Sequence, residues 1–201
     1  NIIRDLRQRY DMTSVIISHD IQSIYRLADC VAFLHEGKII FQGAVGDIQK
    51  TDNPIVRRFF DSSNKSTKTH HVSDEKPYVT VRDLHKSFSG KPVLKGVSLD
   101  IPTRQITVII GGSGSGKSVL LKHILGLFTP DSGQVCVDGL ELTKASERER
   151  ESMRTRIGML FQGAALFDSM SVRDNVAFAL RERRHAVPKA EVDDRVEEIM
   201  A

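Results

Sequence analysis

The sequence has only two cysteines, Cys30 and Cys136, and both lie in apolar stretches that are typical of strands. Neither has a second ligand at a metal-binding spacing, so buried reduced thiols in a cytoplasmic protein are expected. No apolar run approaches the ~20 residues that a bilayer-spanning helix needs. Any membrane role should therefore involve a partner. The net charge of +3 is too small to indicate a nucleic-acid partner.

Residues 1–62 predict a helix, a strand, a helix, a hairpin and a closing helix. The strand is the apolar stretch "TSVIIS", after which Asp20 is expected to cap the second helix. The stretch "VAFLHEGKIIFQG" predicts a hairpin that turns at Glu36-Gly37, and "NPIVRRFFD" predicts the last helix.

Residues 63–77 predict a polar linker, because they contain one aliphatic residue and no aromatic residue. The His70–His71 pair within it has no further ligand at a metal-site spacing.

Residues 78–201 form a second segment with its own pattern. Strands are expected in "YVTVRDL", "VLKGVSLDI", "QITVII", "DSGQVCVDG" and "IGMLFQ", and a helix in "VLLKHILGLF". The mixed charges of "ERERESMRTR" are typical of a solvated helix face, since the interleaved Glu residues argue against a nucleic-acid stripe.

One motif between the strand "QITVII" and the following helix carries chemistry. Residues 111–118 match G-x-x-x-x-G-K-[ST] in full. In this pattern glycines let successive N–H groups turn inward around an anion, and the helix adds its positive N-terminus. The lysine reaches the β- and γ-phosphates, and the last hydroxyl binds Mg²⁺. The expected nucleotide-binding residues here are Gly111, Gly112, Ser113, Gly114, Ser115, Gly116, Lys117, Ser118 and Val119.

The order of these stretches resembles the first half of an ABC-transporter ATPase domain. The resemblance implies an α/β P-loop NTPase fold, with a RecA-like core and an antiparallel β subdomain, that binds ATP and Mg²⁺. Phe88 stands where that family places an aromatic ring against adenine, although a strand core position is the alternative. Gln162, which closes "MLFQ", matches the family's Q-loop glutamine, a ligand of Mg²⁺ that also contacts the attacking water.

Two further stretches narrow the resemblance. "FQGAALFDSMSVRDNVAFALRE" is similar to the ATPase subunits of Mla/Mce-type phospholipid transporters, and "VIISHDIQSIYRLADCVAFLHEGKIIFQG" resembles the end of such a domain. His19 then matches the family's switch histidine, which approaches the γ-phosphate. The implied catalytic residues are His19, Lys117 and Gln162, with Ser118 and Gln162 at the metal.

Two motifs that the ABC family uses for hydrolysis are missing from this sequence. No apolar strand ends in Asp-Glu, and no L-S-G-G signature is present. Residues 1–62 match the tail of one ABC domain and residues 78–201 the head of another. A window cut from a tandem protein, a permutation or a joined reading would each explain this order. The first and last are favoured, because the chain begins and ends within helical patterns and is expected to be a fragment. Arg104 replaces the glycine usual at a turn in this family.

The resemblance implies that the protein takes part in ATP hydrolysis that powers a transporter of lipid type. The implied partners are a membrane permease and a second ABC ATPase domain, with no nucleic acid, at the cytoplasmic face of the inner membrane. A non-transport ABC protein and a nucleotide-binding module without turnover are the alternatives. The chain by itself is expected to bind Mg-ATP weakly and to hydrolyse it negligibly.

Overall fold

The computed structural model describes residues 2–18, 20–60, 76–159, 166–181 and 188–200. It divides into two units, Asn1–Arg156 and Ile157–Ala201, and each is described by itself. Within these described ranges, no helix combines the length and the apolar character that a membrane crossing requires.

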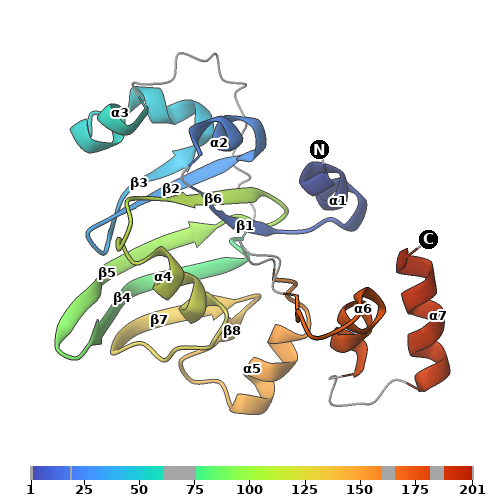
Figure 1. Cartoon of the computed structure of the whole chain (residues 1–201). Helices are drawn as coiled ribbons and strands as arrows, with labels where there is room; N and C mark the ends of the chain where they lie inside the picture. Colours follow the sequence, from blue (N-terminus) through green and yellow to red (C-terminus); the bar gives the residue numbers. More distant parts are fainter. Residues whose placement is uncertain (1, 19, 61–75, 160–165, 182–187, 201) are drawn as a thin grey trace. The chain divides into compact units, whose positions relative to one another are not determined.

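The first sheet joins residues from both sides of the expected linker. Its strands are β1 (Ser14–Ile17), β2 (Cys30–His35), β3 (Lys38–Ala44) and β6 (Ile106–Ile110), in the order β1-β6-β2-β3. Figure 1 shows β6 between the blue strands β1 and β2, and it runs parallel to both. All five residues of β6 are buried, as a central parallel strand requires. The strand that leads into the glycine-rich loop is therefore flanked by the N-terminal segment.

Helices of the N-terminal segment cover one face of this sheet. They are α1 (Ile2–Tyr10), α2 (Ile21–Leu27), the 3₁₀ helix η1 (Val45–Lys50) and α3 (Pro54–Phe60). Asp20 caps α2 as predicted, because its Oδ1 accepts a hydrogen bond from Gln22 N at 3.1 Å. The hairpin turn is also confirmed, with Glu36 and Gly37 both at positive φ between β2 and β3. The buried core between helices and sheet consists of Ile24, Ala28, Val31, Phe33, Val45, Ile48, Val56, Phe60, Ile106, Val108 and Ile110.

Asp29 ties α1, β2 and β6 together in this core. Its side chain is almost fully buried, pairs with the guanidinium of Arg7, and accepts a hydrogen bond from Ile106 N at 2.8 Å. Its own N–H donates to Ile106 O at 2.9 Å, and its carbonyl accepts from Val45 N at 3.1 Å. One carboxylate thus bridges the N-terminal segment and the first residue of β6.

The second sheet is wholly antiparallel. Its strands are β4 (Val79–Phe88), β5 (Lys91–Ile101), β7 (Ser132–Val137) and β8 (Leu140–Glu141), in the order β5-β4-β7-β8. The predicted Asp-Gly turn after β7 is confirmed, with Asp138 and Gly139 both at positive φ. The charged stretch forms α5 (Glu147–Arg154), which begins with a capping box of Ser146 and Glu149. The expected α/β fold with an antiparallel β subdomain is present.

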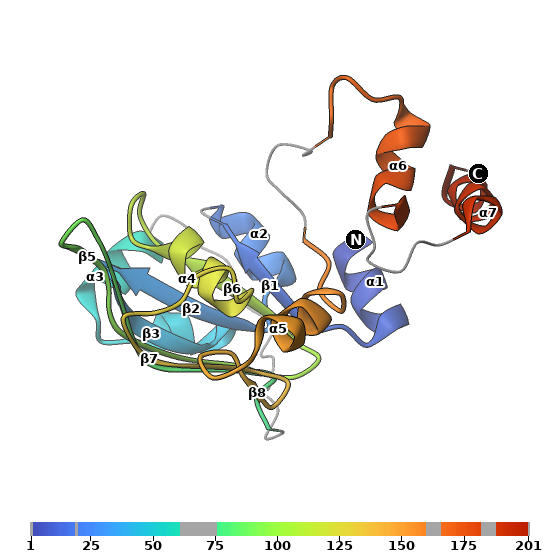
Figure 2. The same cartoon turned by 90° about the horizontal axis from the view of Figure 1, so that it is seen from below.

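The second unit contributes two helices, α6 (Val172–Arg181) and α7 (Lys189–Met200). Figure 1 and Figure 2 both show them side by side. Ala177, Val192 and Val196 form a small buried core between them, with Val176 and Leu180 packed against it.

Two local expectations need correction. The strand expected in "IGMLFQ" is absent from its described part, because residues 157–159 belong to no strand and Met159 is 40% exposed. These three residues have no neighbouring strand to complete a ladder, and 160–162 lie outside the described residues. The helix expected in "VLLKHILGLF" is α4 (Lys117–Ile124), which ends early because Gly126 turns the chain at a φ of +63°.

Arg104 adopts the turn conformation that favours glycine, with a φ of +57°. Its N–H donates to Thr13 Oγ1 at 2.9 Å, and its Nε lies 2.7 Å from Asp11 Oδ2. Contacts with the N-terminal segment therefore hold an arginine in a conformation that is costly for a residue with a side chain.

Candidate phosphate-binding site

The predicted glycine-rich loop connects β6 to α4, at the end of the central strand of the first sheet. Ser115, within the loop, is buried, whereas Gly112, Ser113, Gly114 and Ser118 are exposed. The loop thus exposes half of its residues while its two ends are anchored in regular structure. A loop between a buried parallel strand and a helix N-terminus is where α/β proteins bind phosphate.

Gly111 is placed where no side chain fits. A β-carbon at this position would lie 2.0 Å from Leu34 O and 2.8 Å from Ser115 Oγ. Leu34 belongs to β2, whose preceding residue Phe33 pairs with Ile110. The loop therefore begins in direct contact with the backbone of the N-terminal segment.

The N-terminus of α4 has no side-chain cap. Its N-cap residue, Gly116, is in the left-handed conformation at a φ of +104° and offers no side-chain hydrogen bond. The first N–H groups of a helix have no partner within the helix, and the helix dipole makes this end positive. The uncapped N-terminus of an eight-residue helix thus provides the donors that a phosphate group accepts.

Lys117 folds back over the loop. Its Nζ donates to Gly111 O at 2.9 Å and to Gly112 O at 2.7 Å, and lies 3.4 Å from Ser115 Oγ. Partial burial lowers the pKa of Lys117 below its ordinary value, because desolvation disfavours the ammonium form. A bound anion would favour the charged form. The partly buried ammonium group would therefore interact strongly with a phosphate bound at the loop.

Of the other predicted site residues, the structure describes Phe88 and Val119. Phe88 lies at the end of β4 with its side chain 40% exposed, and its ring centroid is 5.6 Å from that of Phe128. Lys86 Nζ lies 5.6 Å from the centroid of the Phe88 ring. Val119 is half-buried in α4.

His19 and Gln162 both lie outside the described residues. Ser18, which precedes His19, donates its N–H to Ile109 O at 3.3 Å, two residues before Gly111.

Comparison with known families agrees with this geometry. The family model described as "ABC transporter" matches residues 94–201, which is more than half of the chain. The chain belongs to the ABC transporter family.

Curated relatives match about half to two thirds of the chain. The probable ribonucleotide transport ATP-binding protein mkl of Mycobacterium leprae is 44% identical over 104 residues, 52% of this chain and 30% of the relative. The chloroplastic protein TRIGALACTOSYLDIACYLGLYCEROL 3 of Arabidopsis thaliana is 42% identical over 140 residues, 67% of this chain and 40% of the relative. The chain thus spans about a third of the length of the curated relatives that it matches.

Solved ABC structures share the fold. A dimeric ATP-binding cassette in a post-hydrolysis state, bound to ADP and Pi, is 29% identical with a TM-score of 0.51, and the match covers 60% of this chain and 54% of the cassette. CbiO1 of Clostridium perfringens, part of the ABC transporter complex CbiONQ, is 31% identical with a TM-score of 0.52, covering 63% of this chain and 50% of CbiO1. The P-loop NTPase fold expected from the sequence is therefore confirmed.

Sequence reasoning missed the residues that support the ABC loop from behind. Leu34 O lies behind Gly111, and Leu94 Cδ2 would lie 2.8 Å from a β-carbon at Gly116. Neither leucine differs in the sequence from any other core residue of a strand. The glycines of the motif were the available signal, since a position that accepts only glycine indicates another atom close to its α-carbon. The motif does not show which residue provides that atom.

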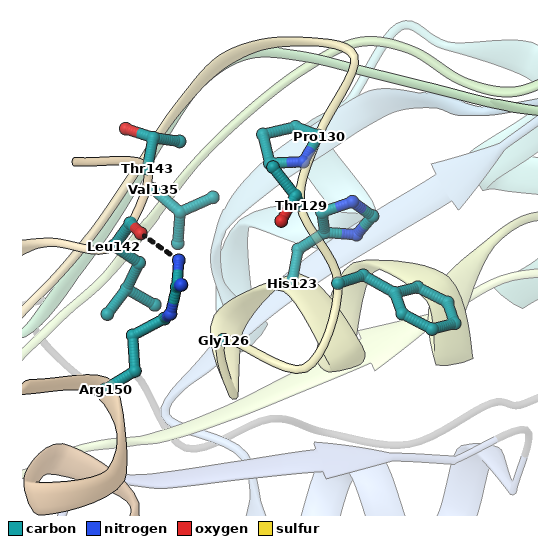
Figure 3. Close-up of a pocket in the computed structure, with 9 residues that line it drawn as sticks. His123, Gly126, Thr129, Pro130, Val135, Leu142, Thr143 and Arg150 are labelled. Atoms are coloured by element: carbon teal, nitrogen blue, oxygen red, sulfur yellow. Dashed lines mark hydrogen bonds between the residues drawn. The ribbon is translucent and has the colours of Figure 1, made fainter. Parts of the chain in front are cut away.

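A second feature of the P-loop helix lies at its other end. Figure 3 shows His123 of α4 and Arg150 of α5 on different sides of a small pocket. The volume of this pocket is ≈ 10 Å³. His123 Nδ1 lies 2.8 Å from Val119 O, and Nε2 is buried near the backbone of Thr129. Burial lowers the pKa of His123 and outweighs the backbone hydrogen bonds to Val119 and Thr129, which raise it; of the nearby charges, Lys86 lowers it and Asp131 raises it. Folding thus favours the neutral imidazole of His123.

The neutral state of His123 predicts a loss of stability in mild acid. The pKa of His123 is lower in the folded state than in the unfolded state, where it is about 6.5. The neutral imidazole therefore makes its full contribution to the free energy of unfolding above about pH 6.5, and this contribution is lost as the pH falls through the folded-state pKa. Urea unfolding at pH 8 and pH 5.5 should show a smaller pH-dependent loss for His123→Gln than for the parent chain. Equal losses in the two proteins would contradict the prediction.

Proposed function

We propose that this chain binds ATP at residues 111–119 and, within a complete assembly, hydrolyses it to power an ABC transporter. One observation carries the proposal. Lys117 Nζ lies over the carbonyls of Gly111 and Gly112, beside the uncapped N-terminus of α4. This arrangement combines a cation with free N–H donors, which is what a triphosphate requires. The solved cassette that this chain resembles was captured with ADP and Pi.

The remaining roles follow from the chemistry of the side chains. Ser118 has an exposed hydroxyl next to Lys117, which suits a Mg²⁺ ligand, and Gln162 would add a second ligand. Mg²⁺ would neutralise charge that develops on the phosphates. The exposed ring of Phe88 would stack on the adenine, and His19 would contact the γ-phosphate.

Residues 1–62 and the segment from residue 78 would share one nucleotide site, on either side of a linker at 63–77. Two contacts support this. Ser18 N bonds to Ile109 O, and Leu34 O lies against Gly111. Both place the N-terminal segment at the β6 end that starts the loop. On this proposal residues 1–62 fold back in a permuted order, and His19 and Lys117 act on the same phosphates.

The finer assignment is a transporter of lipid type. It rests on the stretches that resemble Mla/Mce-type ATPases, while relatives carry names that refer to ribonucleotide transport and to sulfate or thiosulfate import. A membrane permease would hold the protein at the cytoplasmic face of the inner membrane. A second ABC domain would complete the site, as the dimeric form of the resembling cassettes suggests.

Nucleotide binding without turnover is the second candidate. The sequence has no apolar strand that ends in Asp-Glu and no L-S-G-G stretch. The chain therefore holds groups that bind phosphate but not the carboxylate that would act as a general base.

Lys117→Ala should weaken binding of Mg-ATP by the 201-residue chain by about tenfold to 100-fold. The reason is the loss of charge-assisted hydrogen bonds, each worth about 1.5–3 kcal/mol. Fluorescent-nucleotide titration measures the affinity. Phosphate-release assays should show no turnover above background in either protein. Steady hydrolysis by the parent chain that Lys117→Ala abolishes would contradict the expected lack of turnover.

A second arm of the same titration tests the shared site. His19→Ala should weaken ATP binding several-fold and leave ADP binding unchanged, because only ATP has a γ-phosphate. Equal affinities of parent and variant for ATP would reject the shared site while leaving the P-loop assignment intact.

A further inference from the structure

A polar groove lies where β3 meets β4 and β5. Its volume is ≈ 500 Å³, within the range of small-molecule sites. Its polar lining includes Lys38 of β3, Asp83 and His85 of β4, and Lys95 and Ser98 of β5. None of these residues belongs to the glycine-rich loop or to the predicted nucleotide contacts.

The groove is built between the edges of two sheets. β3 is an edge strand of the first sheet and β5 an edge strand of the second. At one end Lys95 N donates to Gly37 O at 2.8 Å. At the other end the Gln42 side chain donates to Asp100 O at 2.8 Å and accepts from Asp100 N at 3.3 Å. These two joins fix the strands on both sides of the groove.

An irregularity in β4 turns Asp83 and His85 outward. Val79 and Val81 face the core, so regular alternation would also bury positions 83 and 85. The register with β5 instead shifts between Val81 and Leu84, and Leu84 takes the next core position. A bulge of this kind re-aims side chains, and such bulges are frequent at functional sites.

The partners of the bulge fit this arrangement. Asp83 has a φ of +45°, and its N–H donates to Ser98 Oγ at 3.0 Å. His85 Nε2 lies 3.1 Å from Asp83 Oδ1. A β-carbon at Gly96 would lie 2.9 Å from Asp83 Oδ1 and 3.3 Å from His85 Nε2. The absence of a side chain at Gly96 therefore makes room for the Asp83–His85 pair in the groove.

The two lysines of the groove have no acidic partner in the described part of the chain. The Lys95 side chain passes over Gly37, the residue before Lys38, since its Cγ lies 3.2 Å from the place of a β-carbon at Gly37. Both lysines line the same groove, so an anion bound there would have two cationic side chains to pair with. The Ser98 hydroxyl accepts from Asp83 N, which leaves its O–H free to donate.

We propose that this groove binds a small ligand through a phosphate group, held by Lys38, Lys95 and Ser98. A tetrahedral oxyanion has enough oxygens to meet donors from two strands at once, and lysines bind phosphate as point charges. The groove is larger than an inorganic phosphate, so the ligand carries an organic part, which the Asp83–His85 pair would contact. A soluble phosphate ester and a phospholipid headgroup present the same chemistry.

The test uses the full chain with Lys117→Ala, so that the glycine-rich loop contributes little to phosphate binding. Titration with glycerol 3-phosphate, followed by NMR of backbone amides, should give saturable shifts at residues 38 and 95–98. Adding Lys38→Gln and Lys95→Gln should weaken binding about tenfold or more. The charge-matched control is Lys50→Gln with Lys144→Gln, whose lysines are exposed and paired with Asp47 and Glu141. It should change the affinity less than about twofold.

A second arm separates the two sources of phosphate. Phosphatidylcholine vesicles with and without phosphatidic acid are sedimented with the same variants. Binding to phosphatidic acid vesicles that depends on Lys38 and Lys95 identifies a lipid headgroup, and binding of glycerol 3-phosphate alone identifies a soluble ester. Binding of neither probe, or equal losses in the groove and control variants, would overturn the proposal. Because Lys117 is already replaced, neither result depends on the nucleotide proposal.

Discussion

Replacing Gly111 by alanine is expected to destabilise the first unit by about 3–5 kcal/mol, a large part of the stability of an ordinary domain. The new β-carbon would lie 2.0 Å from Leu34 O and 3.1 Å from Leu34 C, both of which are backbone atoms. Relief requires β2 and the loop to separate, because a backbone carbonyl cannot rotate away as a side chain does. Gly111 also has a positive φ of +155°, which adds strain for any residue with a side chain.

Thermal unfolding measures this loss, which should lower the melting temperature by about 10 °C. Gly112→Ala is the matched control for stability, since a β-carbon at Gly112 meets nothing within 4 Å. Its melting temperature should lie within about 2 °C of the parent value. Similar melting temperatures for both variants would show that Leu34 does not abut the loop.

The loop was predictable because its chemistry is contiguous in sequence. Eight successive residues specify the anion site, and the apolar strand before them and the helix after them supply its context. The hairpin at Glu36-Gly37 and the Asp20 cap were predictable for the same reason, since each depends on neighbours in the chain.

The partners of β6 were not predictable from local pattern. Residues 14–17 and 30–33 lie beside 106–110 across a separation of more than 70 residues. Nothing in "SVII" or "CVAF" specifies which strand they pair with, because a buried parallel strand is apolar on both faces. The strand expected in "IGMLFQ" was wrong for its described residues for the same reason: apolar character does not guarantee a neighbouring strand.

The polar groove was also missed, although the sequence carries a weak signal for it. Core positions follow a spacing of two at Val79 and Val81 and then of three at Leu84. This change of spacing marks a bulge. The position of Gly96 opposite the bulge comes only from the pairing of β4 with β5, which the pattern does not contain.

The connection between the two segments leads to the second large effect. Asp29→Ala should cost about 3–5 kcal/mol, the amount expected when one partner of a buried ion pair is removed. Ile106 N, at the buried start of β6, would lose its 2.8 Å acceptor, and Arg7 would lose its partner. An unsatisfied buried N–H alone costs about 1–3 kcal/mol. Urea unfolding monitored by circular dichroism measures the change.

Two milder variants divide this effect between its causes. Asp29→Asn keeps an oxygen that can accept from Ile106 N, so it should recover about half of the loss. Arg7→Gln leaves the buried Asp29 carboxylate without its cation but keeps an amide that can donate to it, so it should cost about 1–3 kcal/mol. If the N-terminal segment supports the loop through Asp29, Asp29→Ala should also weaken nucleotide binding at temperatures where the variant remains folded. A folded Asp29→Ala protein with parental affinity would show that the segment stabilises β6 without shaping the site.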